Sequence, residues 1–178
     1  TIDGSSRMIA FLSTMPMNGA TLNAIGSTGS VNTATYYVEA LSSTQSGAIQ
    51  VEGRWFIIHH VDQTKGTASY TVGNEDRYPI AGFTLISDMG TQVGGSYRNA
   101  KFYYSRNSYS VKYYNGGSVE KEASYKYEED ISNAANYMPQ TRPTGVPDSY
   151  EFKGWYLDPD GGQQYEFGGK KMPVGGIV

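Results

Sequence analysis

The chain has 178 residues, 38% of them hydrophobic and 17% charged, with a formal net charge of −3 and no Cys. This length holds about one to two domains of ~100–200 residues each, and no apolar run approaches the ~18 residues of a membrane helix. A negative net charge does not attract the phosphates of a nucleic acid. The absence of Cys excludes disulfides, thiolate nucleophiles and metal sites with Cys ligands. We therefore expect neither a nucleic-acid partner nor membrane insertion.

The residue types favour strands and tight turns over helices. The chain holds 16 Tyr and 22 Gly, and aromatic side chains suit a pleated surface while Gly supplies positive φ. We therefore predict a mostly β (α+β) fold. The segment that follows Thr1 has neither the basic nor the apolar region of a signal peptide, and the residues before Val178 do not resemble a sorting tail. We therefore interpret both ends as cut ends of a longer chain.

The first segment, residues 1–32, echoes the end of the chain. Phe-Leu-Ser-Thr-Met-Pro at residues 11–16 is similar to Phe-Gly-Gly-Lys-Lys-Met-Pro at residues 167–173. A similarity between distant segments is the mark of a repeat architecture. It predicts that residues 1–32 are the end of a preceding repeat.

Two strands are predicted next, at residues 36–38 and 55–58. The second is the continuous apolar run Trp-Phe-Ile-Ile, which is too short for a helix and favours a strand buried on both faces. His59 and His60 follow it directly. Neighbours on a strand point to opposite faces, so we expect no metal ion shared by the pair and interpret both histidines as structural.

An internal repeat begins at residue 78 and recurs 72 residues later. Both copies contain a Tyr, a Gly four positions on, an aromatic residue directly after the Gly, and a Leu two positions beyond that aromatic: Tyr78, Gly82, Phe83 and Leu85, then Tyr150, Gly154, Trp155 and Leu157. We interpret the first three residues of each copy as a structural core element. The Gly lets a backbone pass closely, and burial of the aromatic side chain stabilises by about 2–3 kcal/mol. The alternative is an exposed aromatic platform for a sugar ring or a peptide.

A polar stretch at residues 105–108 separates two aromatic strands, which are predicted at residues 100–104 and 109–114. We place a module boundary at this stretch. It divides the chain into a module at residues 33–106 and a second module at residues 107–178.

One short helix is predicted at residues 128–137. It would begin with Glu128, Glu129 and Asp130 and end before Pro139. Acidic residues are favoured at the N-terminal end of a helix because they compensate its dipole. We therefore interpret these acids as helix-starting residues and not as paired catalytic carboxylates.

No motif in the sequence predicts catalysis or a cofactor. Asp158 and Asp160 belong to an acidic Gly turn, and the following residues do not complete the ~6–8 oxygen ligands of a calcium loop. The Gly pairs lack the strand-to-helix context of a phosphate loop, and no Gly-x-Ser-x-Gly element is present. We expect no catalytic residue, no metal, no cofactor and no enzyme activity.

Residues 109–173 resemble the internalin-type B repeat of bacterial surface proteins. The resemblance rests on Phe-Lys-Gly-Trp-Tyr at residues 152–156, the acidic turn at residues 158–162, and the later Tyr-Glu-Phe and Met-Pro. Residues 33–106 are more distantly similar to the mucin-binding-protein (MucBP-like) repeat, mainly through Phe-Tyr-Tyr-Ser-Arg-Asn before the boundary. These resemblances imply tandem β-grasp-like (ubiquitin-like) modules with one short helix, outside the cell on the surface or cell wall of a Gram-positive bacterium.

The resemblances leave two functions open. In the first, the modules are non-catalytic parts of an adhesin that bind a host glycan or a host protein, or that position a neighbouring domain that does. In the second, they are a structural stalk with no ligand of its own. The sequence identifies no ligand-binding residue for either function.

The B-repeat family usually closes with a strand that is missing after Val178, which predicts an open sheet edge. Residues 14–25 are similar to such a closing strand. They would pair with the open edge of another copy, head to tail, or with their own chain by folding back. The alternatives are that they pack on the first module or fray.

Overall fold

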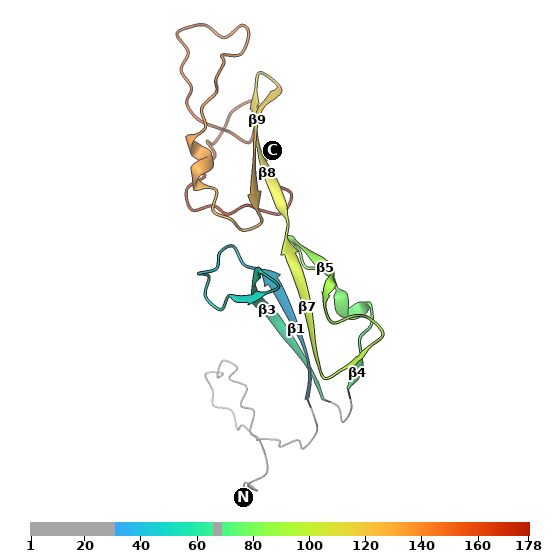
Figure 1. The fold of residues 1–178 in the computed structure, drawn as a ribbon. Coiled ribbons are helices and arrows are strands. Elements are labelled where there is room, and N and C mark those ends of the chain that lie inside the picture. The colour runs from blue at the N-terminus through green and yellow to red at the C-terminus, as the bar shows by residue number, and fades with distance from the viewer. Residues whose placement is uncertain (1–30, 66–68) are drawn as a thin grey trace, which may run out of the picture.

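The computed structural model describes residues 31–65 and 69–178, and their regular structure is almost entirely β (Figure 1). The helices of the described residues are two short 3-10 turns, η1 (Glu75–Arg77) and η2 (Ser132–Asn136), with no α-helix among them. The prediction of a mostly β fold is confirmed. The finer prediction of β-grasp modules is not shown by this arrangement. The preceding-repeat segment, apart from its last two residues, and the closing-strand candidate at residues 14–25 lie outside the described residues.

A five-stranded sheet forms the first half of the described chain, in the order β2-β3-β1-β7-β5. The central strand β1 pairs antiparallel with β3 and parallel with β7, and the remaining pairs are antiparallel. Two further short strands, β4 and β6, pair with each other. The bounds are β1 (Val31–Glu39), β2 (Ile49–Val51), β3 (Arg54–Lys65), β4 (Tyr70–Thr71), β5 (Phe83–Gly90), β6 (Ser96–Tyr97) and β7 (Asn99–Arg106).

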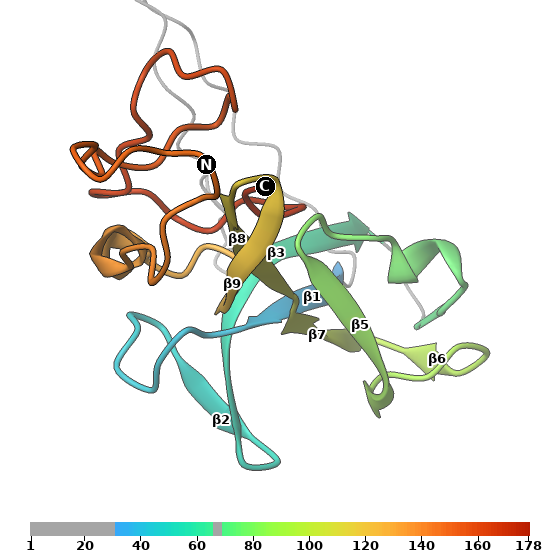
Figure 2. The same cartoon turned by 90° about the horizontal axis from the view of Figure 1, so that it is seen from above.

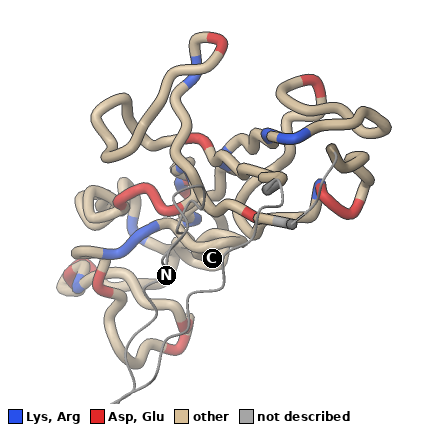
Figure 3. Tube along the Cα trace, turned by 90° about the horizontal axis from the view of Figure 1, so that it is seen from below, with Lys and Arg blue, Asp and Glu red and all other residues tan. Residues whose placement is uncertain are grey.

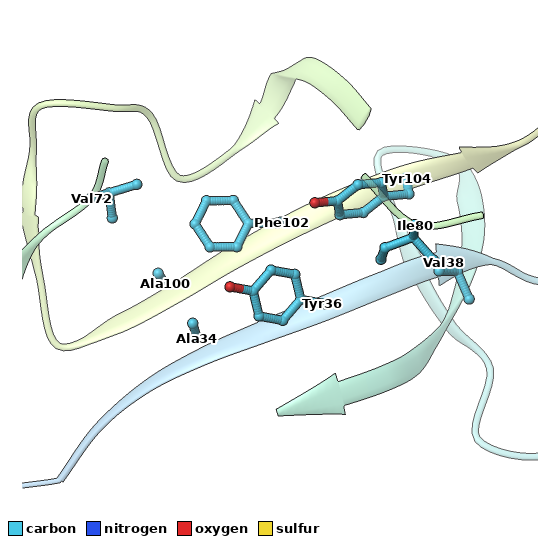
Figure 4. Packing of buried hydrophobic residues seen from close by; sticks show 8 residues of the cluster. All are labelled: Ala34, Tyr36, Val38, Val72, Ile80, Ala100, Phe102 and Tyr104. Atoms are coloured by element: carbon cyan, nitrogen blue, oxygen red, sulfur yellow. The ribbon is translucent and has the colours of Figure 1, made fainter. Parts of the chain in front are cut away.

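The sheet buries side chains on both faces of its central strands. Tyr36 of β1 and its β7 partner Phe102 lie in one core cluster, while the next pair along, Tyr37 and Tyr103, stacks on the other face with ring centroids 4.9 Å apart. This follows from the period of two along a strand, combined with cover on both sides, as is usual for parallel pairs. Figure 4 shows the first cluster: Ala34, Tyr36, Val38, Val72, Ile80, Ala100, Phe102 and Tyr104.

The second half begins with a hairpin of β8 (Ser108–Asn115) and β9 (Ser118–Lys126). Its two-residue turn is Gly116 and Gly117, with φ of 60° and 83°. Two consecutive positive φ values suit the right-handed twist of hairpin strands, and only Gly adopts them cheaply. The chain after η2 is mostly irregular and lies mainly to one side of the hairpin, as Figure 2 shows in orange and red.

This irregular chain packs a second core against the hairpin. Its buried residues are Val111, Tyr113, Ile131, Ala134, Phe167, Met172 and Ile177. The end of the chain also pairs with β8: the Ile177 N–H donates to the Ser110 carbonyl and the Lys112 N–H to the Ile177 carbonyl, both at 2.9 Å. The two bonds make a parallel bridge.

The α-helix predicted at residues 128–137 is wrong. Glu128 has a positive φ of 62°, and the backbone around it pairs with a distant segment: its N–H donates to the Met172 carbonyl, while the Met172 N–H donates to the Glu129 carbonyl, both at 2.9 Å. Asp130 forms a further bridge with Lys171. The positive φ of Glu128 and the long-range hydrogen bond to the Glu129 carbonyl are incompatible with the first turn of an α-helix. Only the η2 turn forms.

Positively and negatively charged residues are scattered along the described chain (Figure 3). No helix of the described residues is long and apolar enough to cross a membrane.

Candidate functional site

The six residues predicted as a repeated core element lie in different surroundings. Tyr78 and Phe83 pack against the first core, and Trp155 packs against the second. Tyr150 does not fit the prediction, because its side chain is 66% exposed. It lies in an irregular loop where its N–H donates to the Pro147 carbonyl, so no strand turns it towards the core.

The two Gly of the repeat also differ in what surrounds them. Gly82 has a φ of 80° and lies directly against the ring of Tyr127, which a Cβ at this position would overlap. Gly154 has a φ of 140° and lies against the flexible side chain of Gln164. The close approach at Gly82 therefore joins the two halves of the chain, because Gly82 precedes β5 and Tyr127 follows β9.

A buried arginine lies where β7 passes into β8. Arg106 has its guanidinium 1% exposed, and its Nε and Nη1 donate to the carbonyl oxygens of Glu39 and Tyr127 at 3.0 and 2.8 Å. Nη1 also lies 2.6 Å from Glu128 Oε2, and the guanidinium covers the Phe83 ring at 4.8 Å. A buried cation is tolerated only when its donors are satisfied. For Nε and Nη1 of Arg106, the partners come from both halves.

Glu39 is the anionic centre of the same region. Its carboxylate accepts hydrogen bonds from Lys126 Nζ at 2.7 Å and from the Arg106 backbone N–H at 2.9 Å, and Arg54 lies 3.4 Å away. Burial alone would raise the pKa of Glu39, but these donors outweigh it and lower the pKa below 4.5. Glu39 is therefore ionised at neutral pH and links β1 to the end of β9.

The connection between the halves is one residue long. β7 ends at Arg106 and β8 begins at Ser108. The N–H of the intervening Asn107 donates to the Gly82 carbonyl at 2.9 Å, and its carbonyl accepts from the Tyr127 N–H at 2.7 Å. We call this region the joint, defined as Glu39, Gly82, Phe83, Arg106, Asn107, Lys126, Tyr127 and Glu128. The polar stretch at residues 105–108 indicated where the joint lies along the chain, but not which distant residues contact it.

The two histidines do not point to opposite faces, which corrects the expectation from strand alternation. Tyr36 pairs with His60 and Tyr37 pairs with Ile58, so His59 is an extra residue in β3. Such a bulge re-aims side chains. As a result, the Nδ1 atoms of His59 and His60 lie 2.6 Å apart.

The acidic turn has the predicted geometry of a turn. The Asp160 N–H donates to Asp158 Oδ1 at 2.9 Å, and the Gly161 N–H donates to the Asp158 carbonyl at 3.1 Å. Aspartate commonly binds the backbone two residues on in this way. Within residues 31–65 and 69–178, no group of three or more His, Cys, Asp or Glu side chains is placed to hold a metal ion.

A groove with exposed aromatic side chains lies on the second half. Its volume is about 530 Å³, and we call it the aromatic groove, defined by Tyr114, Tyr150, Phe152, Trp155 and Tyr156. All of these except Trp155 are exposed by 39% or more. The Trp155 Nε1 donates to the Tyr137 carbonyl at 2.9 Å, which fixes the indole. The alternative interpretation of the repeated element, as an exposed aromatic platform, pointed to Tyr150 and Trp155 of this groove but not to its other residues.

Comparison with known proteins adds one result. No curated protein and no solved structure matches the chain. Residues 109–178 match the model of the Listeria-Bacteroides repeat domain (List_Bact_rpt), a repeat found in bacterial surface proteins. This match names neither the internalin-type B repeat nor the mucin-binding-protein repeat.

Proposed function

We propose that this chain is a non-catalytic repeat segment of a bacterial cell-surface adhesin, and that it holds neighbouring parts of that protein in a fixed relative orientation. The family match at residues 109–178 supports a repeat of surface proteins and an extracellular location. The observation that carries the orienting role is the buried Arg106 of the joint.

The joint restricts movement more than an ordinary linker does. Neighbouring domains move relative to one another by default unless their interface is large and hydrophobic. Here a single linking residue has both backbone groups bonded, one to each half. Any swing of the halves would also strip the Arg106 guanidinium of the Tyr127 carbonyl and the Glu128 carboxylate. Opening the joint would break these charge-assisted hydrogen bonds, each of which contributes about 1.5–3 kcal/mol.

The shape of the described chain supports the same role. Figure 1 shows β7 running on into β8, with the second half extending away from the five-stranded sheet. An end-to-end arrangement with contacts only between neighbours is typical of repeats that build a stalk. A rigid joint would transmit the direction of one repeat to the next.

Residual dipolar couplings test this role directly. The unmodified chain should give one alignment tensor for both halves, because they tumble together. Arg106→Gln removes the charge and the Nε donor and should give two different tensors. Arg54→Gln is the control, since Arg54 also lies near Glu39 but is 40% exposed and contacts the first half only. Two independent tensors in the unmodified chain, or one tensor retained in Arg106→Gln, would refute the orienting role.

A second function, adhesion to a host glycan, is favoured by the aromatic groove. Exposed aromatic faces offer rigid contact area at small entropic cost, and the groove gathers four of them. The double variant Tyr150→Ala/Phe152→Ala should abolish any signal on a glycan array. Val93→Ala, at a similarly exposed apolar residue of the first half that does not line the groove, is the control. A host-protein pull-down with the same variants separates a glycan from a protein ligand.

A further inference from the structure

The bulge in β3 creates a pair of imidazoles that a regular strand could not form. His59 and His60 are neighbours in sequence, yet their Nδ1 atoms are 2.6 Å apart and their rings meet at 76°. Two neutral imidazoles at this distance share at most one proton between the two nitrogens, so a lone pair always faces the gap.

The surroundings fix one member of the pair and leave the other accessible. The His60 ring is stacked on Tyr36 at 4.2 Å and on Tyr78 at 5.4 Å. Its Nε2 is buried and has no hydrogen-bond partner among the described residues, so Nδ1 is the nitrogen available to a ligand. His59 is exposed, with its ring edge towards Phe83 at 6.5 Å. The His60 ring is therefore held in a fixed orientation, whereas the His59 ring can rotate to coordinate an ion.

The spacing selects the geometry of the ion. With metal–nitrogen bonds of about 2.0–2.1 Å, two nitrogens about 2.9 Å apart subtend a right angle at the metal, whereas a tetrahedral angle needs about 3.3–3.4 Å. The observed 2.6 Å is close to the first spacing and far from the second. Right-angled imidazole pairs suit square-planar or octahedral ions such as Cu²⁺ and Ni²⁺ more than tetrahedral Zn²⁺.

We propose that His59 and His60 form a two-histidine site for Cu²⁺ or Ni²⁺, with water completing the coordination. Asp62 is close enough to affect the charge of His60, so its negative charge favours a cation nearby. A metal ion binds the neutral form of imidazole, so binding to this pair should become weaker as pH falls.

Electron paramagnetic resonance of Cu²⁺ tests the site, with an untagged chain because a polyhistidine tag would compete. One equivalent of CuCl₂ at pH 7.5 should give a tetragonal spectrum with superhyperfine coupling to two nitrogens. His59→Gln should leave a single coupled nitrogen and weaken Cu²⁺ binding by at least about tenfold in calorimetric titration. His59 is exposed, so this variant should fold normally. His60→Gln, checked by circular dichroism, provides the second arm.

Ni²⁺ provides an independent readout. NiCl₂ should raise the melting temperature of the unmodified chain and not that of His59→Gln, since an ion held by two side chains of the folded state stabilises that state. Lowering the pH to 5 should weaken the effect, because protons compete with the ion for imidazole nitrogens. Asp62→Asn should weaken binding by less than His59→Gln. Cu²⁺ coordinated by one nitrogen, or equal affinity in the unmodified chain and His59→Gln, would overturn the proposal.

Discussion

The core around Tyr36 and the core around Tyr113 are both built on aromatic residues, but different backbones support them. The first lies on five hydrogen-bonded strands and buries side chains on both faces. The second has one hairpin, and its remaining residues come from irregular chain held by single bridges. The same Tyr–Gly–aromatic element therefore packs Tyr78 in one half and exposes Tyr150 in the other. A repeated motif specifies its buried aromatic more strictly than the residues around it.

The largest expected effect comes from removing one core at a time. Phe102→Ala should destabilise the first core by about 3–5 kcal/mol, and Ile131→Ala the second by about 2–5 kcal/mol; both side chains are at most 1% exposed. The chain has two Trp, Trp55 in the first half and Trp155 in the second, so fluorescence of single-Trp variants during urea unfolding follows each half.

Two distinct transitions, each moved only by its own core variant, would show that the halves unfold separately. If each variant moves both transitions equally, the joint couples the cores into one unit. Val119→Ala, at an exposed residue of β9, should move neither.

The next prediction compares the loss of stability on substituting Gly82 and Gly154, the two Gly of the repeat. Gly82→Ala should cost more than about 2 kcal/mol, because a positive φ costs about 1–2 kcal/mol for a residue with a Cβ and the Tyr127 ring must also move. Gly154→Ala should be costly for a different reason: Gln164 can swing away, but a φ of 140° lies outside the left-handed region that a residue with a Cβ can adopt. Gly117→Ala, with a positive φ and open space around it, measures the backbone strain alone. Thermal unfolding gives the order, and equal losses at Gly82 and Gly117 would contradict the contact with Tyr127.

Glu39 sharpens the comparison at the joint. Glu39→Gln should cost about 1–3 kcal/mol, as loss of charged hydrogen bonds does. Because the folded-state pKa of Glu39 lies below 4.5, its contribution is present above pH 4.5 and is lost as pH falls through the folded-state pKa. Unfolding free energy measured between pH 3 and 6 should therefore fall less steeply in Glu39→Gln than in the unmodified chain. Parallel curves would show that Glu39 does not titrate with folding.

The smallest effect concerns His60. Its pKa is lowered from 6.5 in the folded state, so the unfolded chain binds a proton first as pH falls. Stability should decrease as pH drops below 6.5 and level off below the folded-state pKa. His60→Gln should remove this part of the pH dependence in metal-free buffer. An unchanged slope between pH 5 and 7 would mean that His60 is equally basic in both states.

The sequence patterns predicted those features of the fold that depend on residues close together in the chain. The strands near residues 36–38 and 109–114 follow from alternation, and Phe83 and Trp155 were found through the internal repeat. The predicted helix failed because Glu128 and Glu129 pair with Met172, a partner far along the chain. The joint and the bulge also depend on long-range register, which places Glu39 beside Arg106 and turns His59 out of alternation. No local pattern contains that information.

The parallel pairing of β1 with β7 determines how the first half responds to force. The chain enters this half at the start of β1 and leaves it at the end of β7, and the two strands run side by side in the same direction. Tension along the chain therefore pulls β1 backwards and β7 forwards. The hydrogen bonds between them lie across the direction of pull and are loaded together in shear, instead of opening one after another. In the surface protein proposed above, such a half would resist extension until all the hydrogen bonds between β1 and β7 break together.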